Sequence, residues 1–183
     1  MKRILLTIIC VVAVIFAHAE GHMRFKGIEI DGDLNSFKSK LEEQGFYGIT
    51  QDGVGLMTGR FTGDMVLLSF SSTPVTDLVY QVMVIYPSLL QWSHLEKKYN
   101  GLVESLKNKY GEPDESIWDV NEDSNPQREL IMDRATIVTR FKFENGGITT
   151  GIMNIPLFGV GVYISYWDKE NRSLYDAEVV DDL

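Results

Sequence analysis

The chain has 183 residues, 44% of them hydrophobic and 23% charged, which is enough apolar material for the core of one compact domain. Its 26 Asp and Glu residues outnumber its 17 Lys and Arg residues, giving a net charge of −9. Like-charge repulsion therefore argues against nucleic acid and against anionic membrane surfaces as partners.

The first nineteen residues have the pattern of an export signal. Lys2 and Arg3 precede an uncharged apolar run from Ile4 to Phe16, and Ala17-His18-Ala19 supplies the small residues around a signal-peptidase cut. A helix that spans a bilayer needs about 20 apolar residues, and this run is shorter. We therefore expect residues 1–19 to be a cleaved signal peptide without a membrane anchor, and the mature protein to be periplasmic or extracellular.

Cleavage after Ala19 would change the composition of the chain. It removes two cations, which lowers Lys plus Arg from 17 to 15 against 26 acids and makes the net charge −11. It also removes Cys10, the only cysteine, so the mature chain would have no disulfide and no cysteine nucleophile. Cys10 lies inside the apolar run and not at its end, which argues against a lipoprotein.

The first half of the mature chain predicts a strand, a helix and three further strands. Residues 24–30 favour a short strand. Asp33 is placed as the N-cap of a helix whose apolar residues recur at spacings of three and four until Gly45. Between Val54 and Tyr86 the period changes to two and turn residues recur, which predicts three antiparallel strands.

The second half repeats this order. A Ser88/Gln91 capping box predicts the start of a long helix, which ends before Gly111. An Asn145-Gly146 hairpin turn joins two of the strands that follow. These strands are expected near Ile117 and over 137–143, 148–155 and 160–166.

The repeated order predicts the fold class. We expect an α+β protein in which two helix-plus-β-meander units form one antiparallel sheet, with the helices packed on one face. Residues 20–167 would form a single domain of two similar halves, 24–87 and 88–167. The acidic tail, 168–183, is predicted as a frayed helix that docks through its few apolar residues.

Several segments of the chain resemble a family of uncharacterised exported bacterial proteins. They are Phe25-Lys26-Gly27-Ile28-Glu29-Ile30-Asp31-Gly32, Leu56 to Gly63, Trp92-Ser93-His94-Leu95 with Tyr99, and Lys109-Tyr110-Gly111-Glu112-Pro113. The resemblance covers most of the mature chain, and its motifs are structural. The duplicated order of elements is also similar to the fold of the beta-lactamase inhibitor protein, a secreted binder without catalysis. This second likeness is one of topology, so it implies no site residue and no lactamase as partner.

An acidic stretch is the candidate metal site. Asp119, Asn121 and Asp123 place side-chain oxygens at every second position, as the start of a calcium loop does. The pattern then fails, because Ser124 stands where such a loop has Gly, and Leu130 stands where it has a bidentate Glu. A solvated surface loop is the main interpretation, with calcium (Ca2+) as the alternative and no other cofactor expected.

The sequence offers no motif for nucleophilic catalysis. A Gly-x-Ser-x-Gly elbow is missing. His94 lies off the apolar stripe of the long helix, and His22 lies in what we expect to be a flexible start of the mature chain. A pair of carboxylates of the glycosidase kind stays open, because 26 acids offer many pairs and their burial is not visible in the sequence.

Two aromatic residues of the last strand are the candidate ligand-binding residues. Tyr163 and Trp167 share the face opposite Val162, Ile164 and Tyr166, so one of the two rows looks outward if the helices cover a single face. An exposed aromatic row would bind protein or sugar, whereas a tail that folds back would cover it. We expect an exported, non-enzymatic binding protein whose partner is a protein or glycan of the cell envelope. The alternative is a carboxylate-based hydrolase of glycans or peptides.

Overall fold

The computed structural model describes residues 21–51, 54–86, 91–121 and 123–181. The predicted signal peptide, 1–19, and Ser88 of the predicted capping box lie outside these ranges. Within them, no helix is long and apolar enough to cross a bilayer.

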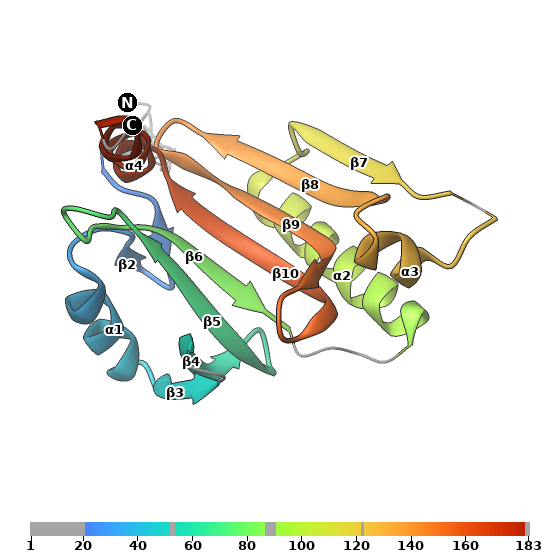
Figure 1. Ribbon diagram of the computed structural model, residues 1–183, viewed down its shortest axis with the longest axis horizontal. Helices are drawn as coiled ribbons and strands as arrows, with labels where there is room; N and C mark the ends of the chain where they lie inside the picture. The colour runs from blue at the N-terminus through green and yellow to red at the C-terminus, as the bar shows by residue number, and fades with distance from the viewer. Residues whose placement is uncertain (1–20, 52–53, 87–90, 122, 182–183) are drawn as a thin grey trace, which may run out of the picture.

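One antiparallel sheet runs through most of the described chain, with its strands in the order β3-β4-β5-β6-β10-β9-β8-β7 (Figure 1). The strands of the first half are β3 (Tyr47–Gln51), β4 (Val54–Phe61), β5 (Asp64–Ser72) and β6 (Val79–Ile85). Those of the second half are β7 (Glu115–Asp119), β8 (Thr136–Phe143), β9 (Gly146–Ile155) and β10 (Gly159–Asp168). The predicted α+β class with a single large antiparallel sheet is confirmed.

The sheet is built from two similar units. Each unit is a helix followed by four strands, with one short additional helix between β7 and β8, and the strand order is symmetric about the central pair, β6 and β10. The predicted duplication and the strand near Ile117 are therefore confirmed, but the first half has one strand more than expected. The missed strand is β3, whose sequence Tyr-Gly-Ile-Thr-Gln has one aliphatic residue and shows little alternation.

Two helices, α1 (Leu34–Glu42) and α2 (Trp92–Tyr110), pack on one face of the sheet, which we call the core face. The predicted N-cap of α1 is confirmed, since a carboxylate oxygen of Asp33 accepts the N–H of Ser36 at 2.9 Å. The capping box of α2 is wrong, because Gln91 itself is the N-cap residue and makes no side-chain cap hydrogen bond. In Figure 1, α2 lies behind the sheet.

The core lies between these helices and the sheet. From α1, Phe37 meets Phe70 of β5 edge to face, with ring centroids 6.0 Å apart. From α2, the hydroxyl of Tyr99 lies 2.7 Å from the hydroxyl of Thr139 on β8. Every second strand residue points into the space between the helices and the sheet, because side chains alternate between the two faces of a strand. These buried residues are Val66, Leu68, Val82, Val84, Val160, Val162, Ile164, Ile148, Ile152, Ile137 and Phe141.

The start of the described chain is a tight hairpin and not the single strand predicted over 24–30. It consists of β1 (Arg24–Phe25) and β2 (Ile28–Glu29), and its turn residues Lys26 and Gly27 have positive φ angles of 50° and 82°. Phe25 is fully buried, with its ring centroid 5.3 Å from that of Tyr166. The hairpin therefore completes the core face beside α1.

Of the two further helices, one was not predicted and the other is the helix predicted for the acidic tail. Helix α3 (Pro126–Ile131) lies in the stretch expected to be a surface loop, with Asn125 as its N-cap and Leu130 buried. Helix α4 (Lys169–Asp181) is the acidic tail, and Figure 1 shows it seen along its axis at the end of the central strands. It is docked, because the rings of Tyr175 and Tyr80 lie 4.8 Å apart.

The side chain of Asn171, on α4, joins three parts of the chain that are distant in sequence. Its Nδ2 donates to the carbonyl of Ile30 at 3.1 Å, to the carbonyl of Val79 at 3.0 Å and to Oδ1 of Asp31 at 3.1 Å. Asn171 is 1% exposed, so water does not replace these bonds. They hold the N-terminal hairpin, the start of β6 and α4 together.

The substitution Asn171→Ala is expected to lower the free energy of unfolding by about 2–4 kcal/mol, because it leaves two buried carbonyls without a donor. Asn108→Ala, at an exposed position of α2, is the control and should change it by less than about 0.5 kcal/mol. Urea unfolding followed by circular dichroism measures both. Equal effects of the two substitutions would show that the Asn171 bonds do not join the segments.

Candidate functional site

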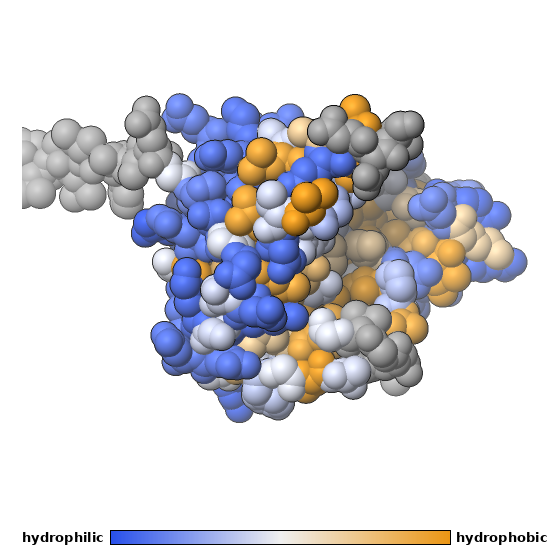
Figure 2. Space-filling model, turned by 60° about the vertical axis from the view of Figure 1, so that its left-hand side comes forward, coloured by the Kyte–Doolittle hydropathy of each residue, from blue (hydrophilic) through white to orange (hydrophobic). Residues whose placement is uncertain are grey.

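The second face of the sheet, which we call the open face, consists of the strand residues that point away from α1 and α2. On the four middle strands none of these residues is charged, although the chain has a net charge of −9. They are Met65, Leu67, Ser69 and Ser71 on β5, Gln81, Met83 and Ile85 on β6, Gly161, Tyr163, Ser165 and Trp167 on β10, and Gly147, Thr149, Gly151 and Met153 on β9. Figure 2 shows this side as a hollow whose floor is coloured mainly tan to orange.

Apolar residues cross the open face from one edge of the sheet toward the other. Strand pairing places them opposite one another, one strand after the next, and we call them the apolar row. Gly151 and Thr58 occupy the remaining positions of this row. Its members are Tyr47, Leu67, Ile85, Tyr163, Val138 and Ile117.

Tyr163 and Trp167, the predicted ligand-binding residues, both lie on the open face. Each ring covers a glycine of β9, since Gly151 is the strand partner of Tyr163 and Gly147 that of Trp167. A Cβ added to Gly151 would lie 2.9 Å from Cε1 of Tyr163, and one on Gly147 would lie 2.8 Å from Cε2 of Trp167. The two rings are thus held against the sheet, and both side chains are half-buried.

Helix α4 bounds the open face at one end. Its Tyr175 stacks on Tyr80, and Glu178 accepts the N–H of Val75 at 2.8 Å and the hydroxyl of Thr76 at 2.6 Å. These contacts fix α4 to the ends of the strands and to the β5–β6 turn. The tail therefore docks at the rim, and its side-chain contacts do not go to Tyr163.

A group of three hydrogen-bonded polar side chains on the open face was not predicted from the sequence. Ser165 lies between Tyr163 and Trp167 and accepts a hydrogen bond from Nε2 of Gln81 at 2.7 Å. Ser71 in turn donates to Oε1 of Gln81 at 3.3 Å. The period-two alternation places these residues on one face, but only the strand order brings β5, β6 and β10 side by side.

A pocket of about 360 Å³ lies at the α3 end of the open face. Polar and apolar side chains both line it, among them Tyr163, Arg140 and Asn154 on the sheet and Ile131 on α3. Burial raises the pKa of Tyr163, and the positive charge of Arg140 opposes that rise in part. The phenol is therefore neutral at physiological pH and can donate a hydrogen bond.

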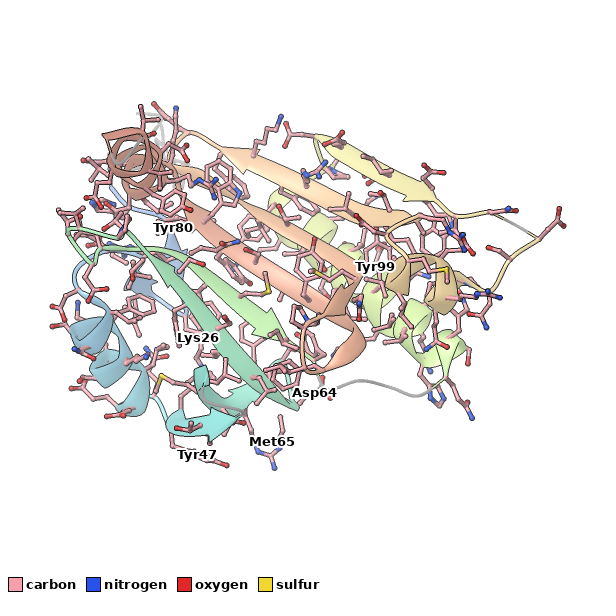
Figure 3. All side chains as sticks on the ribbon, viewed as in Figure 1. Lys26, Tyr47, Asp64, Met65, Tyr80 and Tyr99 are labelled. Atoms are coloured by element: carbon pink, nitrogen blue, oxygen red, sulfur yellow. The ribbon has the colours of Figure 1, made fainter. Side chains whose placement is uncertain are left out.

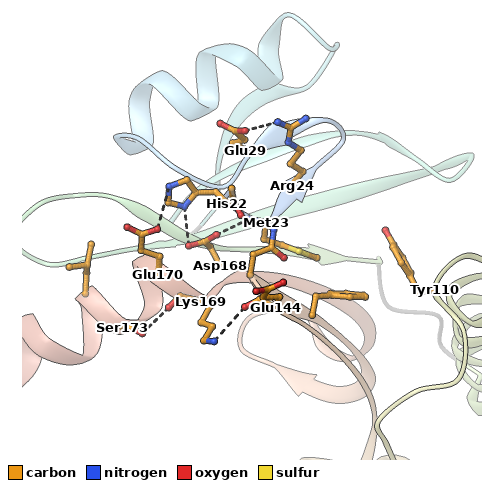
Figure 4. A pocket seen from close by; sticks show the side chains of 14 residues that line it. His22, Met23, Arg24, Glu29, Tyr110, Glu144, Asp168, Lys169, Glu170 and Ser173 are labelled. Carbon is orange, nitrogen blue, oxygen red and sulfur yellow. Dashed lines mark hydrogen bonds and ion pairs between the residues drawn. The ribbon is translucent and has the colours of Figure 1, made fainter. Parts of the chain in front are cut away.

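A second cavity, of about 1230 Å³, lies where the N-terminal hairpin meets α4 (Figure 4). One of its lining residues is Asp168, an acid that is 1% exposed and that was predicted to belong to the acidic tail. Asp168 accepts the N–H of Met23 at 2.7 Å and the N–H of Asn171 at 2.9 Å. Nδ1 of His22 lies 3.2 Å from Oδ1 of Asp168, a close ion pair without hydrogen-bond alignment. We call Asp168, His22 and Asn171 the clasp.

The expectation that His22 is flexible is wrong, because carboxylates surround its ring. Nε2 lies 3.6 Å from Oδ2 of Asp31 and 3.9 Å from Oε2 of Glu170. Burial alone would lower the pKa of His22, but Asp168, Asp31 and Glu170 together raise it above 6.5. The carboxylates on both sides of the ring favour the protonated form of His22, which pairs with Asp168 in the clasp.

The described residues give the cavity no nucleophile. Ser173 lines it, but its hydroxyl donates to the carbonyl of Lys169 at 2.9 Å. Both oxygens of Asp168 already accept backbone N–H groups. Four acids line the cavity, Glu29, Glu144, Asp168 and Glu170, and among the described residues only Asp168 is fully buried. The carboxylate-based hydrolase stays an untested alternative.

The candidate calcium residues lie on an exposed turn. Asp119 ends β7, and Oδ1 of Asn121 accepts the N–H of Asp123 at 3.0 Å. Across the described residues, no group of three or more His, Cys, Asp or Glu side chains is placed to hold a metal ion. Calcium binding by Asp119, Asn121 and Asp123 stays a prediction. His94 is exposed on α2.

Comparison of the chain with models of protein families, with curated proteins and with solved structures gave no match.

The substitution Gly151→Ala is expected to lower the free energy of unfolding by about 1–3 kcal/mol, because the new Cβ would lie 2.4 Å from the carbonyl oxygen of Ile137 and against the ring of Tyr163. The control is Gly101→Ala on α2, where nothing lies within 4 Å and alanine should stabilise the helix by up to about 1 kcal/mol. Thermal unfolding compares the two. A neutral Gly151→Ala would show that the ring does not cover the glycine.

The clasp makes stability depend on pH. Because the folded-state pKa of His22 is raised, its stabilising contribution is complete below about pH 6.5 and is lost as the pH rises through the folded value. The difference in unfolding free energy between the natural chain and His22→Gln should thus be larger at pH 5.5 than at pH 8.5. Asn108→Gln, at an exposed position of α2, is the control and should give the same difference at both pH values, because neither side chain titrates. A difference for His22→Gln that grows with pH would contradict the ion pair.

Proposed function

We propose that the protein is an exported, non-enzymatic binding module and that the open face is its binding surface. One observation carries the proposal: the four middle strands present an uncharged, largely apolar floor on a chain with a net charge of −9. The leader of residues 1–19 supports an envelope location, periplasmic or extracellular. The partner is a protein or a glycan of the cell envelope.

The residues of the open face can bind a partner through contacts between uncharged groups. Large contiguous apolar surfaces on soluble domains commonly mark interaction sites. Rings such as Tyr163 and Trp167, fixed over glycines, offer contact area at low cost in conformational entropy. Ser165 adds a hydroxyl group between the rings, and Gln81 and Ser71 add an amide and a hydroxyl group on the strands beside Trp167. Both a protein loop and a sugar ring can use this combination.

Charged groups lie away from the centre of the floor. Arg140 and Glu115 pair with each other on β8 and β7, and Lys142 lies beyond the pocket on β8. The negative charge of the molecule is thus spread over its other surfaces. Binding to the open face should therefore depend little on ionic strength, because contacts between uncharged groups are not screened.

The substitution Ser69→Arg tests this surface. Ser69 lies on the open face of β5 opposite Met83, so an arginine there would extend over the floor and bring a charge into it. Envelope partners retained by the immobilised natural protein, and glycans bound from a panel of cell-wall sugars, should be lost with this variant by at least about tenfold. Ser39→Arg, exposed on α1 at the opposite side of the sheet, carries the same charge change and should keep them.

Two results would contradict the proposal. One is equal retention of every partner by Ser69→Arg and Ser39→Arg. The other is loss of all retention with added salt, which would indicate ionic contacts at another surface. Far-UV circular dichroism of both variants confirms that each is folded before the comparison.

A further inference from the structure

The eight-stranded sheet ends in two outer strands, β3 and β7, each paired on one side only among the described residues. An outer strand presents N–H and C=O groups that can pair with another chain. Natural proteins block such pairing with charged side chains, proline or short strands at the edge. The two edges of this sheet differ in how well they are blocked.

The β7 edge is guarded by charge. The strand runs Glu115-Ser116-Ile117-Trp118-Asp119, with an acid at each end. If two copies of β7 paired antiparallel about Ile117, Glu115 of one copy would lie opposite Asp119 of the other. Like charges directly opposite each other destabilise a pair of strands. A strand that pairs here with itself is therefore disfavoured.

The β3 edge has no charged residue or proline that would prevent pairing with another strand. Every residue from Gly45 to Gln51 is uncharged, and the stretch contains no proline. Tyr47 is 55% exposed, and Gly48 and Thr50 are exposed as well. Figure 3 shows Tyr47 at the lower rim of the molecule, on the outer strand of the sheet. The strand pairs with β4 on its inner side from Tyr47 to Gln51.

We propose that a second copy of this chain docks on β3, so that the two β3 strands pair antiparallel about Ile49. Tyr47 then lies opposite Gln51 of the partner copy, and Gly48 lies opposite Thr50, with no charge brought against a like charge. This self-complementary register favours a second copy at β3, because it brings no charge against a like charge at the contact. The twofold axis is perpendicular to the sheet, as antiparallel pairing of identical strands requires.

The arrangement has a consequence for the open face. Opposite residues of an antiparallel pair point to the same side of the sheet, so both open faces look in one direction. The two apolar rows lie on this same side but are offset by four residues along the strands, because Tyr47 of each copy lies opposite Gln51 of the other. The five residues of β3 bury little area, so the contact is weak and depends on protein concentration.

The oligomeric state of the leader-free protein, starting at Glu20, tests the proposal. Sedimentation velocity over a roughly hundredfold concentration range should show the mass of one chain at the low end and of two chains at the high end. Hydrogen exchange at the amides of 47–51 should slow at the high concentration, because pairing protects them. A mass of one chain throughout would overturn the proposal.

Edge variants assign the contact to β3. Thr50→Lys places a lysine on each copy at the paired edge and should shift the dissociation constant upward by at least about tenfold. Ser116→Lys makes the same charge change on exposed β7 and should leave association intact. Thr50→Glu is the second edge variant if Thr50→Lys does not fold. Association that persists in the folded Thr50 variant, or that is lost only in Ser116→Lys, would refute pairing through β3.

Discussion

Pairing between β6 and β10 is the constraint on which the rest of the architecture depends. These are the last strands of the two halves, and their register runs from Tyr163 opposite Ile85 to Trp167 opposite Gln81. Backbone hydrogen bonds at this junction join two four-stranded meanders into one sheet. Without it neither the core face nor the open face would be continuous, and Ser165 would lack its bond to Gln81.

Two glycines of β9 shape the open face, because they have no side chains. Gly147 and Gly151 on β9 leave room for the rings of Trp167 and Tyr163, which lie down against the sheet. A side chain at either glycine would collide with backbone or ring atoms. The two rings fill the space above the glycines. The open face of the middle strands carries no charge, which is the physical basis for the binding proposal.

The clasp performs a different task, at the end of the sheet. It uses a fully buried acid, which is costly to desolvate unless hydrogen bonds and a cation compensate. Asp168 has both, from the N–H groups of Met23 and Asn171 and from His22. The N-terminal hairpin is thereby tied to the last strand and to α4, so that the hairpin's Phe25 can stay in the core.

Local patterns in the sequence determined much of this fold. The N-cap at Asp33, the apolar stripe of α2 and the alternation of β8 to β10 depend on neighbours close in sequence, and they identified the two similar units. The tertiary structure alone decided the strand order, the burial of Asp168, the fixed position of His22 and the covering of Gly151 by Tyr163. Each of these joins residues far apart in the chain, such as Met23 and Asp168. A carboxylate in a sequence looks the same whether buried or solvated, because only its partners in space set its environment.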